Sequence, residues 1–237
     1  MSSFFITGTD TDAGKTVLTA LLLSALHQRG YNALPMKPAQ SGCTDNIPDL
    51  DYALALSGIQ ADPTLRALLA PACYAPACSP HLAAEMENRP LTLQHLVDTY
   101  HALRTQAETL LVEGAGGALV PLNREETMLD LMTELQLPIL IAARPGLGTI
   151  NHTLLTIKAL HQRNLRIAGF VFIHTRPDGS DFTEPDNART IAEFGQTPWL
   201  GTIPYIPELD TPNPNPFSKL PTAVQTLTQE ILEKILP

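Results

Sequence analysis

Cysteine and positive charge are both scarce in this sequence, and each scarcity argues against a class of protein. The three cysteines among 237 residues are an odd count in a long chain, which favours reduced thiols over a disulfide framework. Lys and Arg number 15 against 24 Asp and Glu, for a net charge of −9, so no nucleic-acid surface is expected. No apolar run approaches the roughly 18 residues of a membrane span, and no basic segment with an apolar core opens the chain. We therefore expect a cytoplasmic protein that binds neither nucleic acid nor membrane.

Apolar residues make up 44% of the chain and fall into short runs that alternate with helix-like segments. The strand-like runs are Phe4–Thr7, Ala33–Met36, Leu110–Glu113, Ile139–Ala143, Ile167–Ile173 and Trp199–Ile203. The helix-like segments lie near residues 15–28, 50–57, 80–87, 92–107, 127–135, 150–163, 184–194 and 219–235. Apolar strands that alternate with helices are typical of parallel sheets covered on both faces. The sequence therefore predicts a single α/β domain over residues 1–237, with a mostly parallel central sheet.

A glycine-bounded loop between the first strand-like run and the first helix-like segment is typical of a phosphate-binding site. It reads Gly8-Thr9-Asp10-Thr11-Asp12-Ala13-Gly14-Lys15-Thr16. In this arrangement backbone N–H groups and the helix N-terminus bind phosphate oxygens, Lys15 adds positive charge, and the Thr16 hydroxyl can bind Mg²⁺. Five residues separate Gly8 from Gly14, where the usual pattern has four. A strand before the loop and a helix after it still predict a P-loop NTPase-like fold.

The carboxyl ends of parallel strands meet at one edge of a sheet, where ligands bind. Lys37 follows the second strand-like run and would face the same edge as Lys15. Two lysines at one site could neutralise a phosphoryl group during transfer, which predicts catalytic roles for both. The other segments expected at this edge are Glu113, residues 143–149, residues 174–180 and Pro204.

Carboxylates near this edge are candidate ligands of Mg²⁺. Glu113 follows a buried strand at what we expect to be an exposed tip, and it leads into Gly114-Ala115-Gly116-Gly117, which lets the backbone approach a ligand. Asp49 and Asp51 lie at the start of the helix-like segment near residues 50–57, and either could be a helix cap instead. We predict a metal site formed by Thr16, Glu113 and Asp51, with Asp49 as the alternative to Asp51.

Several motifs together resemble those of the dethiobiotin synthetases. The extra residue in the phosphate-binding loop is a feature of that family. The loop is followed, in the family's order and spacing, by Lys37-Pro38, Ser41-Gly42, Ser79-Pro80-His81, Val112-Glu113-Gly114-Ala115-Gly116-Gly117 and Gly146-Leu147-Gly148-Thr149-Ile150-Asn151-His152. The resemblance extends from residue 2 to about residue 208.

The resemblance implies an ATP- and Mg²⁺-dependent cyclo-ligase of biotin biosynthesis that acts on 7,8-diaminononanoate, ATP and CO₂. One amine takes up CO₂ as a carbamate, and the carbamate attacks the γ-phosphate. The second amine then displaces phosphate, which closes a cyclic urea and gives dethiobiotin, ADP and phosphate. In this family the substrate carboxylate sits at a helix start from the second subunit of a homodimer, which corresponds here to Thr149-Ile150-Asn151.

The resemblance also implies roles for individual residues. Lys37 is the catalytic lysine, Lys15 holds the phosphates, and Thr16, Asp51 and Glu113 hold Mg²⁺. The implied ATP-binding residues are Asp12, Ala13, Gly14, Lys15, Thr16, Val17, Asp51, Glu113, Gly114, Ala115, Gly116, Thr175, Pro204, Tyr205 and Ile206. The implied substrate-binding residues are Thr11, Ser41, Gly117, Thr149, Ile150 and Asn151.

One segment departs from the family pattern. Many relatives carry an Asn-Asp pair after the fifth apolar strand, and this pair reads the edge of adenine. This chain has Ile173-His174-Thr175 there. Because an isoleucine side chain forms no hydrogen bonds, we expect looser recognition of the base, through Thr175, Pro204, Tyr205 and backbone groups.

Two other protein classes share this type of fold. Nucleotide-switch ATPases of the partitioning or septum-positioning type carry a second lysine near the start of the loop, where this chain has Asp10, and many have a basic amphipathic tail that we do not find here. Cobyrinate-type synthetases need a glutaminase part with a nucleophilic cysteine. Cys43, Cys73 and Cys78 do not lie in a strand–turn–helix elbow, so a free-standing ligase is favoured.

Overall fold

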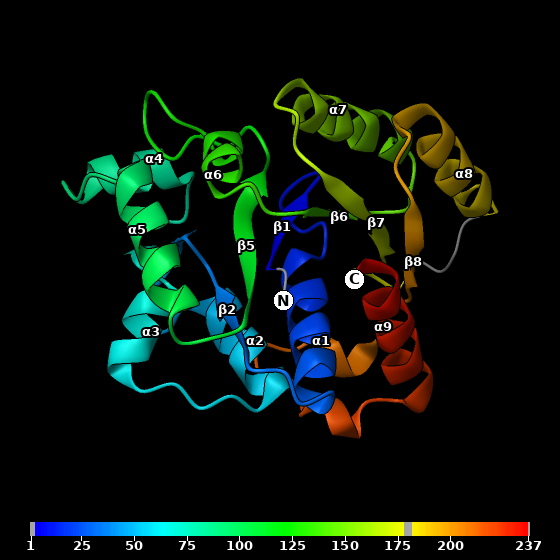
Figure 1. The fold of residues 1–237 in the computed structure, drawn as a ribbon, viewed down its shortest axis with the longest axis horizontal. Coiled ribbons are helices and arrows are strands. Elements are labelled where there is room, and N and C mark those ends of the chain that lie inside the picture. The colour runs from blue at the N-terminus through cyan, green and yellow to red at the C-terminus, as the bar shows by residue number, and fades with distance from the viewer. Residues whose placement is uncertain (1–2, 178–181, 237) are drawn as a thin grey trace.

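A parallel β-sheet of six strands forms the centre of the molecule (Figure 1). The computed structural model describes residues 3–177 and 182–236. The strand order is β2-β5-β1-β6-β7-β8. Its strands are β1 (Phe4–Gly8), β2 (Ala33–Met36), β5 (Thr109–Gly117), β6 (Ile139–Ala143), β7 (Ile167–Ile173) and β8 (Trp199–Ile203). A separate parallel pair is formed by β3 (Ala39–Ser41) and β4 (Ala72–Tyr74).

Helices connect the strands and cover the sheet. They are α1 (Lys15–Gln28), α2 (Pro48–Ser57), α3 (Pro63–Leu69), α4 (Pro80–Met86), α5 (Leu93–Arg104), α6 (Met128–Leu135), α7 (Thr149–Gln162), α8 (Glu184–Gly195) and α9 (Thr222–Ile235). Short 3₁₀ helices lie at Pro207–Leu209 and Phe217–Lys219. Within residues 3–177 and 182–236, no helix has both the length and the apolar character needed to cross a membrane.

The side-chain alternation of β1 shows why both faces of the sheet are covered. Phe4 and Ile6 point to one face and pack in a core with α1 and α9, which lie side by side in Figure 1. Phe5 points to the opposite face, into a core that includes residues of α5, α6 and α7. All three side chains are at most 1% exposed. The near-continuous apolar strands of the sequence therefore reflect burial from two sides.

The predicted fold class is confirmed, and the six strand-like runs are the six strands of the central sheet. The strands β3 and β4 and the helix α3 were not predicted from the sequence. Strands of three residues are too short to show an alternating pattern. The start of α3 did carry a signal, because Asp62 caps the helix by accepting a hydrogen bond from the Leu65 N–H, and Pro63 is its first residue.

Candidate active site

The loop between β1 and α1 has the backbone shape of a phosphate-binding loop. Gly14 caps α1 with a φ of 89°, in the left-handed region, and a Cβ atom there would lie 2.6 Å from Cγ2 of Ile173. The Lys15 side chain folds back over the loop, and its Nζ donates a hydrogen bond to the Asp10 carbonyl at 2.9 Å. A Cβ atom at Gly8 would lie 2.9 Å from the backbone carbonyl oxygen of Asp10. Both glycines are therefore required by close approach.

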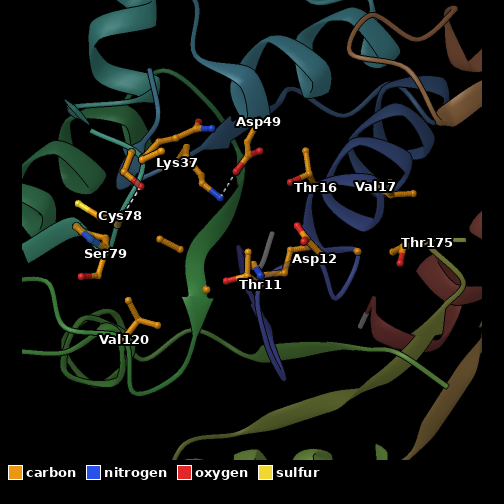
Figure 2. A pocket seen from close by; sticks show the side chains of 18 of the residues that line it. Thr11, Asp12, Thr16, Val17, Lys37, Asp49, Cys78, Ser79, Val120 and Thr175 are labelled. Atoms are coloured by element: carbon orange, nitrogen blue, oxygen red, sulfur yellow. Dashed lines mark hydrogen bonds and ion pairs between the residues drawn. The ribbon is translucent and has the colours of Figure 1, made fainter. Parts of the chain in front are cut away.

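Lys37 lies at the centre of a buried network next to this loop. Its backbone N–H donates to the Leu69 carbonyl at the end of α3, at 2.7 Å, so the missed helix positions this lysine. Its Nζ donates to Glu113 Oε1 at 2.7 Å and to the Gly114 carbonyl at 3.2 Å, and it forms an ion pair with Asp49 Oδ2 at 2.6 Å. Figure 2 shows the Lys37 side chain directed towards Asp49. The three N–H groups of the ammonium thus each have a partner.

The two lysines have opposite electrostatic surroundings. Burial alone would lower the pKa of Lys37, but the charges of Glu113 and Asp49 and their hydrogen bonds outweigh burial and raise this pKa above its ordinary value. Burial lowers the pKa of Lys15, and the neighbouring charge of Lys37 lowers it further. Lys37 is therefore held firmly protonated, whereas the charge of Lys15 lacks a comparable set of anionic partners.

Glu113 is buried, so the expectation of an exposed strand tip is wrong. It is 3% exposed, as is Lys37, because β5 continues to Gly117 and lies between β2 and β1. Its Oε1 accepts hydrogen bonds from both Lys37 Nζ and Thr16 Oγ1, each at 2.7 Å. These contacts join the phosphate-binding loop, the second strand and the fifth strand at one point.

The structure places Asp49, rather than Asp51, beside the network. Asp49 pairs with Lys37, whereas the Asp51 carboxylate pairs with Arg66 and accepts a hydrogen bond from the Ile47 N–H at 2.9 Å. Asp51 therefore helps to anchor the start of α2. Its predicted role as a metal ligand has no support in this geometry, and the alternative residue, Asp49, is the one at the site.

The oxygen atoms around Lys37 suit Mg²⁺. This ion prefers one or two carboxylates together with waters and substrate phosphates, so it needs no closed cage of protein ligands. Thr16 and Glu113 are in direct contact, and Asp49 reaches the same ammonium as Glu113. Among the residues that the structure describes, no cluster of three or more His, Cys, Asp or Glu side chains could hold a metal by itself. An ion here would therefore share the site with phosphate oxygens.

A cavity of about 800 Å³ opens above this network. Figure 2 shows Lys37 and Asp49 in the middle of the cavity wall. Thr16 and Val17 lie to one side of them, and Cys78 and Ser79 lie to the other side. The expected site residues that line the cavity are Thr11, Asp12, Gly14, Lys15, Thr16, Val17, Lys37, Ser41, Ala115, Gly116 and Thr175. Glu113 does not line it but contacts Lys37 and Thr16 from below.

Other expected residues lie elsewhere. Thr149 lines a neighbouring cavity together with Thr9 and Arg144, and a third cavity follows the start of α7 along Thr149, Ile150 and Asn151. The Pro204–Ile206 segment does not line the first cavity: Ile206 is buried in the core beside α1 and α9, and the Tyr205 hydroxyl donates to Asp210 at 2.6 Å. Of the loop expected at residues 174–180, positions 178–180 lie outside the described residues.

The segment that departs from the family pattern is partly in the core. Ile173 is 1% exposed and packs against Gly14. His174 contacts Glu184 through Nε2 at 2.9 Å, and Glu184 accepts a hydrogen bond from Thr202 at 2.7 Å. His174 thus links β7, α8 and β8. His81, of the Ser79-Pro80-His81 motif, does not line the first cavity.

Several residues that line the cavity were given no role from the sequence. They are Gln40, Ala77, Cys78, Ser79, Pro80, Val120 and Arg176, of which Ser79 and Pro80 were named only as part of a family motif. Asp49, which also lines the cavity, was the alternative metal ligand. Gln40 lies between the Lys37-Pro38 and Ser41-Gly42 motifs, so its position in the sequence was a usable signal. The loop at 77–80 precedes α4, and it reaches the site because β4 pairs with β3.

Solved structures share this fold at low sequence identity. The cell division ATPase MinD of Pyrococcus furiosus is 18% identical, with a TM-score of 0.64 and coverage of 99% of this chain and 98% of that chain. A ParA family ATPase of Chlorobium tepidum is 14% identical, with a TM-score of 0.54 and coverage of 98% and 91%. At these identities the likeness concerns the fold alone.

Sequence comparison gives a narrower result. A family profile described as an AAA domain matches residues 2–213. The ATP-dependent dethiobiotin synthetase BioD of Halalkalibacterium halodurans is 42% identical over 217 residues, which cover 88% of this chain and 87% of the relative. The enzyme of the same name from Anaeromyxobacter dehalogenans is 40% identical over 209 residues, which cover 88% and 92%. The chain therefore belongs to the ATP-dependent dethiobiotin synthetase family.

Proposed function

We propose that this protein is a dethiobiotin synthetase that uses ATP to close a cyclic urea on 7,8-diaminononanoate with CO₂. The observation that carries the proposal is the buried Lys37 network, which joins the phosphate-binding loop to the rest of the cavity. The similarity to enzymes named ATP-dependent dethiobiotin synthetase supports the same activity, as a ligase of biotin biosynthesis.

ATP would bind with its phosphates on the loop from Asp12 to Val17. The N-terminus of α1, which begins at Lys15, presents N–H groups to an anion, and Lys15 would exchange the Asp10 carbonyl for a phosphate oxygen. Thr175, at the edge of the cavity, would contact the nucleoside.

The diamine would occupy the cavity next to Ser41 and Thr11. One amine adds to CO₂ and loses a proton, which gives a carbamate whose two oxygens share one negative charge. A carbamate oxygen then attacks the γ-phosphorus, and ADP leaves. The second amine attacks the carbamate carbon, the ring closes, and phosphate departs with the oxygen that had joined carbon to phosphorus.

Lys37 would stabilise the charge that moves through these steps. Its ammonium stays protonated at neutral pH because its pKa is raised, and it would lie between the carbamate and the γ-phosphate. A fixed positive charge there favours the oxygen-to-phosphorus bond without any proton transfer to Lys37.

Mg²⁺ would be held by Thr16, Glu113 and Asp49. When bound, it supplies positive charge that neutralises the phosphate oxygens. The three residues carry the hard oxygen donors that this ion prefers.

We propose a homodimer that forms through the face of α7 and α8. Leu147, Leu155 and Phe194 are large apolar side chains with exposures of 105%, 58% and 78%, and a cavity follows Thr149 to Asn151 on this face. The backbone N–H groups at the start of α7 would then bind the carboxylate of the substrate that occupies the partner subunit. The protein would work in the cytoplasm, which the three free cysteines support.

The activity is tested by incubating the protein with 7,8-diaminononanoate, ¹³C-bicarbonate, ATP and Mg²⁺, followed by mass spectrometry. The expected product has the mass of the diamine plus one labelled CO₂ minus one water, and ADP and phosphate appear in equal amounts. Lys37→Ala, prepared in parallel, controls for a contaminating enzyme. A product without the label, or ATP hydrolysis without a product, would overturn the proposal.

A further inference from the structure

Arg176 is an exposed arginine in the wall of the active-site cavity. It lies three residues after the end of β7, on the same edge of the sheet as the phosphate-binding loop. Its side chain forms no hydrogen bond or ion pair with any residue that the structure describes. The other arginine near the loop, Arg144, lines a neighbouring cavity and pairs with Asp10 at 3.3 Å. Arg176 therefore offers this cavity a guanidinium that is available to a ligand.

The position of Arg176 indicates which part of a bound nucleotide it would meet. Figure 2 shows Cys78 on one side of Lys37, and Val17 and Thr175 on the other. A triphosphate on the phosphate-binding loop would direct its γ-phosphate to Lys37, and its nucleoside would then extend towards Val17 and Thr175. Arg176 follows Thr175 directly and lines the same cavity. It is therefore a wall residue of the nucleoside end.

Other side chains expected to read the base at this end do not line the cavity. Ile173 is apolar and 1% exposed, and the Tyr205 hydroxyl donates to Asp210. No aromatic side chain is found among the described residues that line the cavity. The guanidinium of Arg176 is flat and delocalised, and such a group stacks on π-systems and is attracted to their faces by its charge. It is thus the group at this end that can pack against the face of a base.

We infer that the Arg176 guanidinium stacks on the nucleobase of ATP and supplies most of the affinity that the base adds to that of the triphosphate. This inference rests on the proposed function, because it takes ATP, with its phosphates on the loop, as the bound nucleotide. Stacking needs only a π-face, which every base has, so this contact gives affinity with little discrimination among bases.

The test compares nucleotides with inorganic triphosphate, which carries the phosphates without a base. Dissociation constants of ATP, CTP, GTP and triphosphate are measured by calorimetry with Mg²⁺ and without the diamine, so that no ring closure occurs. Arg176→Ala removes the guanidinium, whereas Arg176→Tyr replaces it with a flat group that has no charge. The matched control is Arg166→Ala, because Arg166 is an exposed arginine just before the other end of β7.

Arg176→Ala should weaken binding of each of the three nucleotides by about 3–30-fold, the range expected for a lost cation–π contact. It should leave the affinity for inorganic triphosphate within about twofold of the wild type. Arg176→Tyr should restore nucleotide binding to within about threefold of the wild type, because the tyrosine ring also stacks on a base. Arg166→Ala should leave all four dissociation constants within about twofold.

Equal weakening of the nucleotides and of triphosphate would show that Arg176 acts on the phosphates through its charge. An unchanged Arg176→Ala would show that the side chain stays in solvent, and a loss confined to one nucleotide would show that it reads a base edge. Nucleotide binding by Arg176→Tyr as weak as that of Arg176→Ala would show that the flat group is not what matters. Each of these results overturns the inference.

Failure of the proposed function is distinguishable, because it is seen in the wild type as the absence of a cyclic urea and not in these binding measurements. A wild type that makes the cyclic urea, together with an unchanged Arg176→Ala, defeats the Arg176 contact alone.

Discussion

The region of the active site expected to bind phosphate differs from the region expected to bind the base. In the phosphate region Lys15, Lys37 and Glu113 are at most 6% exposed, and each has a hydrogen-bond partner. At the tips of β7 and β8, Ile173 is an apolar core residue and the Tyr205 hydroxyl is committed to Asp210. Charges that are buried together fix one geometry, because each would be costly without the others. We therefore expect this protein to recognise a triphosphate and its acceptor strictly and the base loosely.

Loss of Lys37 should produce the largest effect at the strict end. Lys37→Ala should reduce turnover by about 10²–10⁴-fold, because it removes the fixed charge at the transferring group. ATP affinity should change little, since Lys15 and the loop amides remain. Steady-state kinetics and nucleotide binding check the two parts separately. Turnover within a few-fold of the wild type would show that the buried charge of Lys37 has a structural role only.

Glu113→Gln should affect both stability and metal use. Because Glu113 is buried against Lys37, the variant should lose about 1–3 kcal/mol of unfolding free energy, less than the roughly 3–5 kcal/mol typical of a broken buried pair, since Asp49 still contacts Lys37. Urea unfolding measures the loss, and the exposed Glu125→Gln is the matched control. The Mg²⁺ concentration for half-maximal activity should rise as well.

The stability difference should also depend on pH in a defined direction. The folded protein raises the pKa of Lys37 above the ordinary 10.5, so stabilisation by its partners is fully present below that pH and is lost as the pH rises through the folded value. The gap between wild type and Glu113→Gln should therefore stay constant from about pH 7 to 9. A gap that closes within this interval would contradict a protonated Lys37.

Substitutions of two neighbouring aspartates should differ in their effect on the Mg²⁺ requirement. Asp49→Asn should raise the Mg²⁺ requirement several-fold, because Asp49 contacts Lys37 in the cavity. Asp51→Asn should leave the Mg²⁺ titration unchanged and cost at most about 1 kcal/mol of stability, since its pair with Arg66 is about one-third exposed. If Asp51→Asn alone shifts the titration, the assignment of Asp49 is wrong.

The smallest effect is expected at the loose end. The buried side chain of Ile173 offers adenine no hydrogen bond, so exchange of the base should cost little. The values of kcat/KM for ATP, CTP and GTP should lie within about tenfold of one another, equivalent to about 1.4 kcal/mol. A thousandfold preference for ATP would show that Thr175 or backbone groups near Pro204 read the base, and the contrast between the two ends would disappear.

The same contrast explains what could be predicted from the sequence. The phosphate-binding loop could be predicted because glycines and a lysine must occur at fixed spacing for the loop to close on phosphate. The six strands could be predicted because burial on both faces makes each strand apolar. The motif around Lys37 and the carboxylate at Glu113 were found for a related reason, since charged residues at the ends of such strands stand out.

Other features depend on contacts that no local pattern encodes. The burial of Glu113 follows from its place between β1 and β2, and Asp49 is distinguished from Asp51 only by the distant partners Lys37 and Arg66. The β3–β4 pair, which brings residues 77–80 to the cavity, consists of three-residue strands without a visible period.

We propose that a carbamate oxygen of the substrate, held at Lys37, attacks the γ-phosphate of ATP. It is tested most directly with CO₂ labelled with ¹⁸O on both oxygens, in a reaction short enough to limit exchange with water, followed by mass analysis of the phosphate released. One ¹⁸O atom should appear in the phosphate and the other in the urea carbonyl, because phosphate leaves with the bridging oxygen. Phosphate that carries oxygen from solvent water instead would mean that water, and not the carbamate, attacks the γ-phosphate.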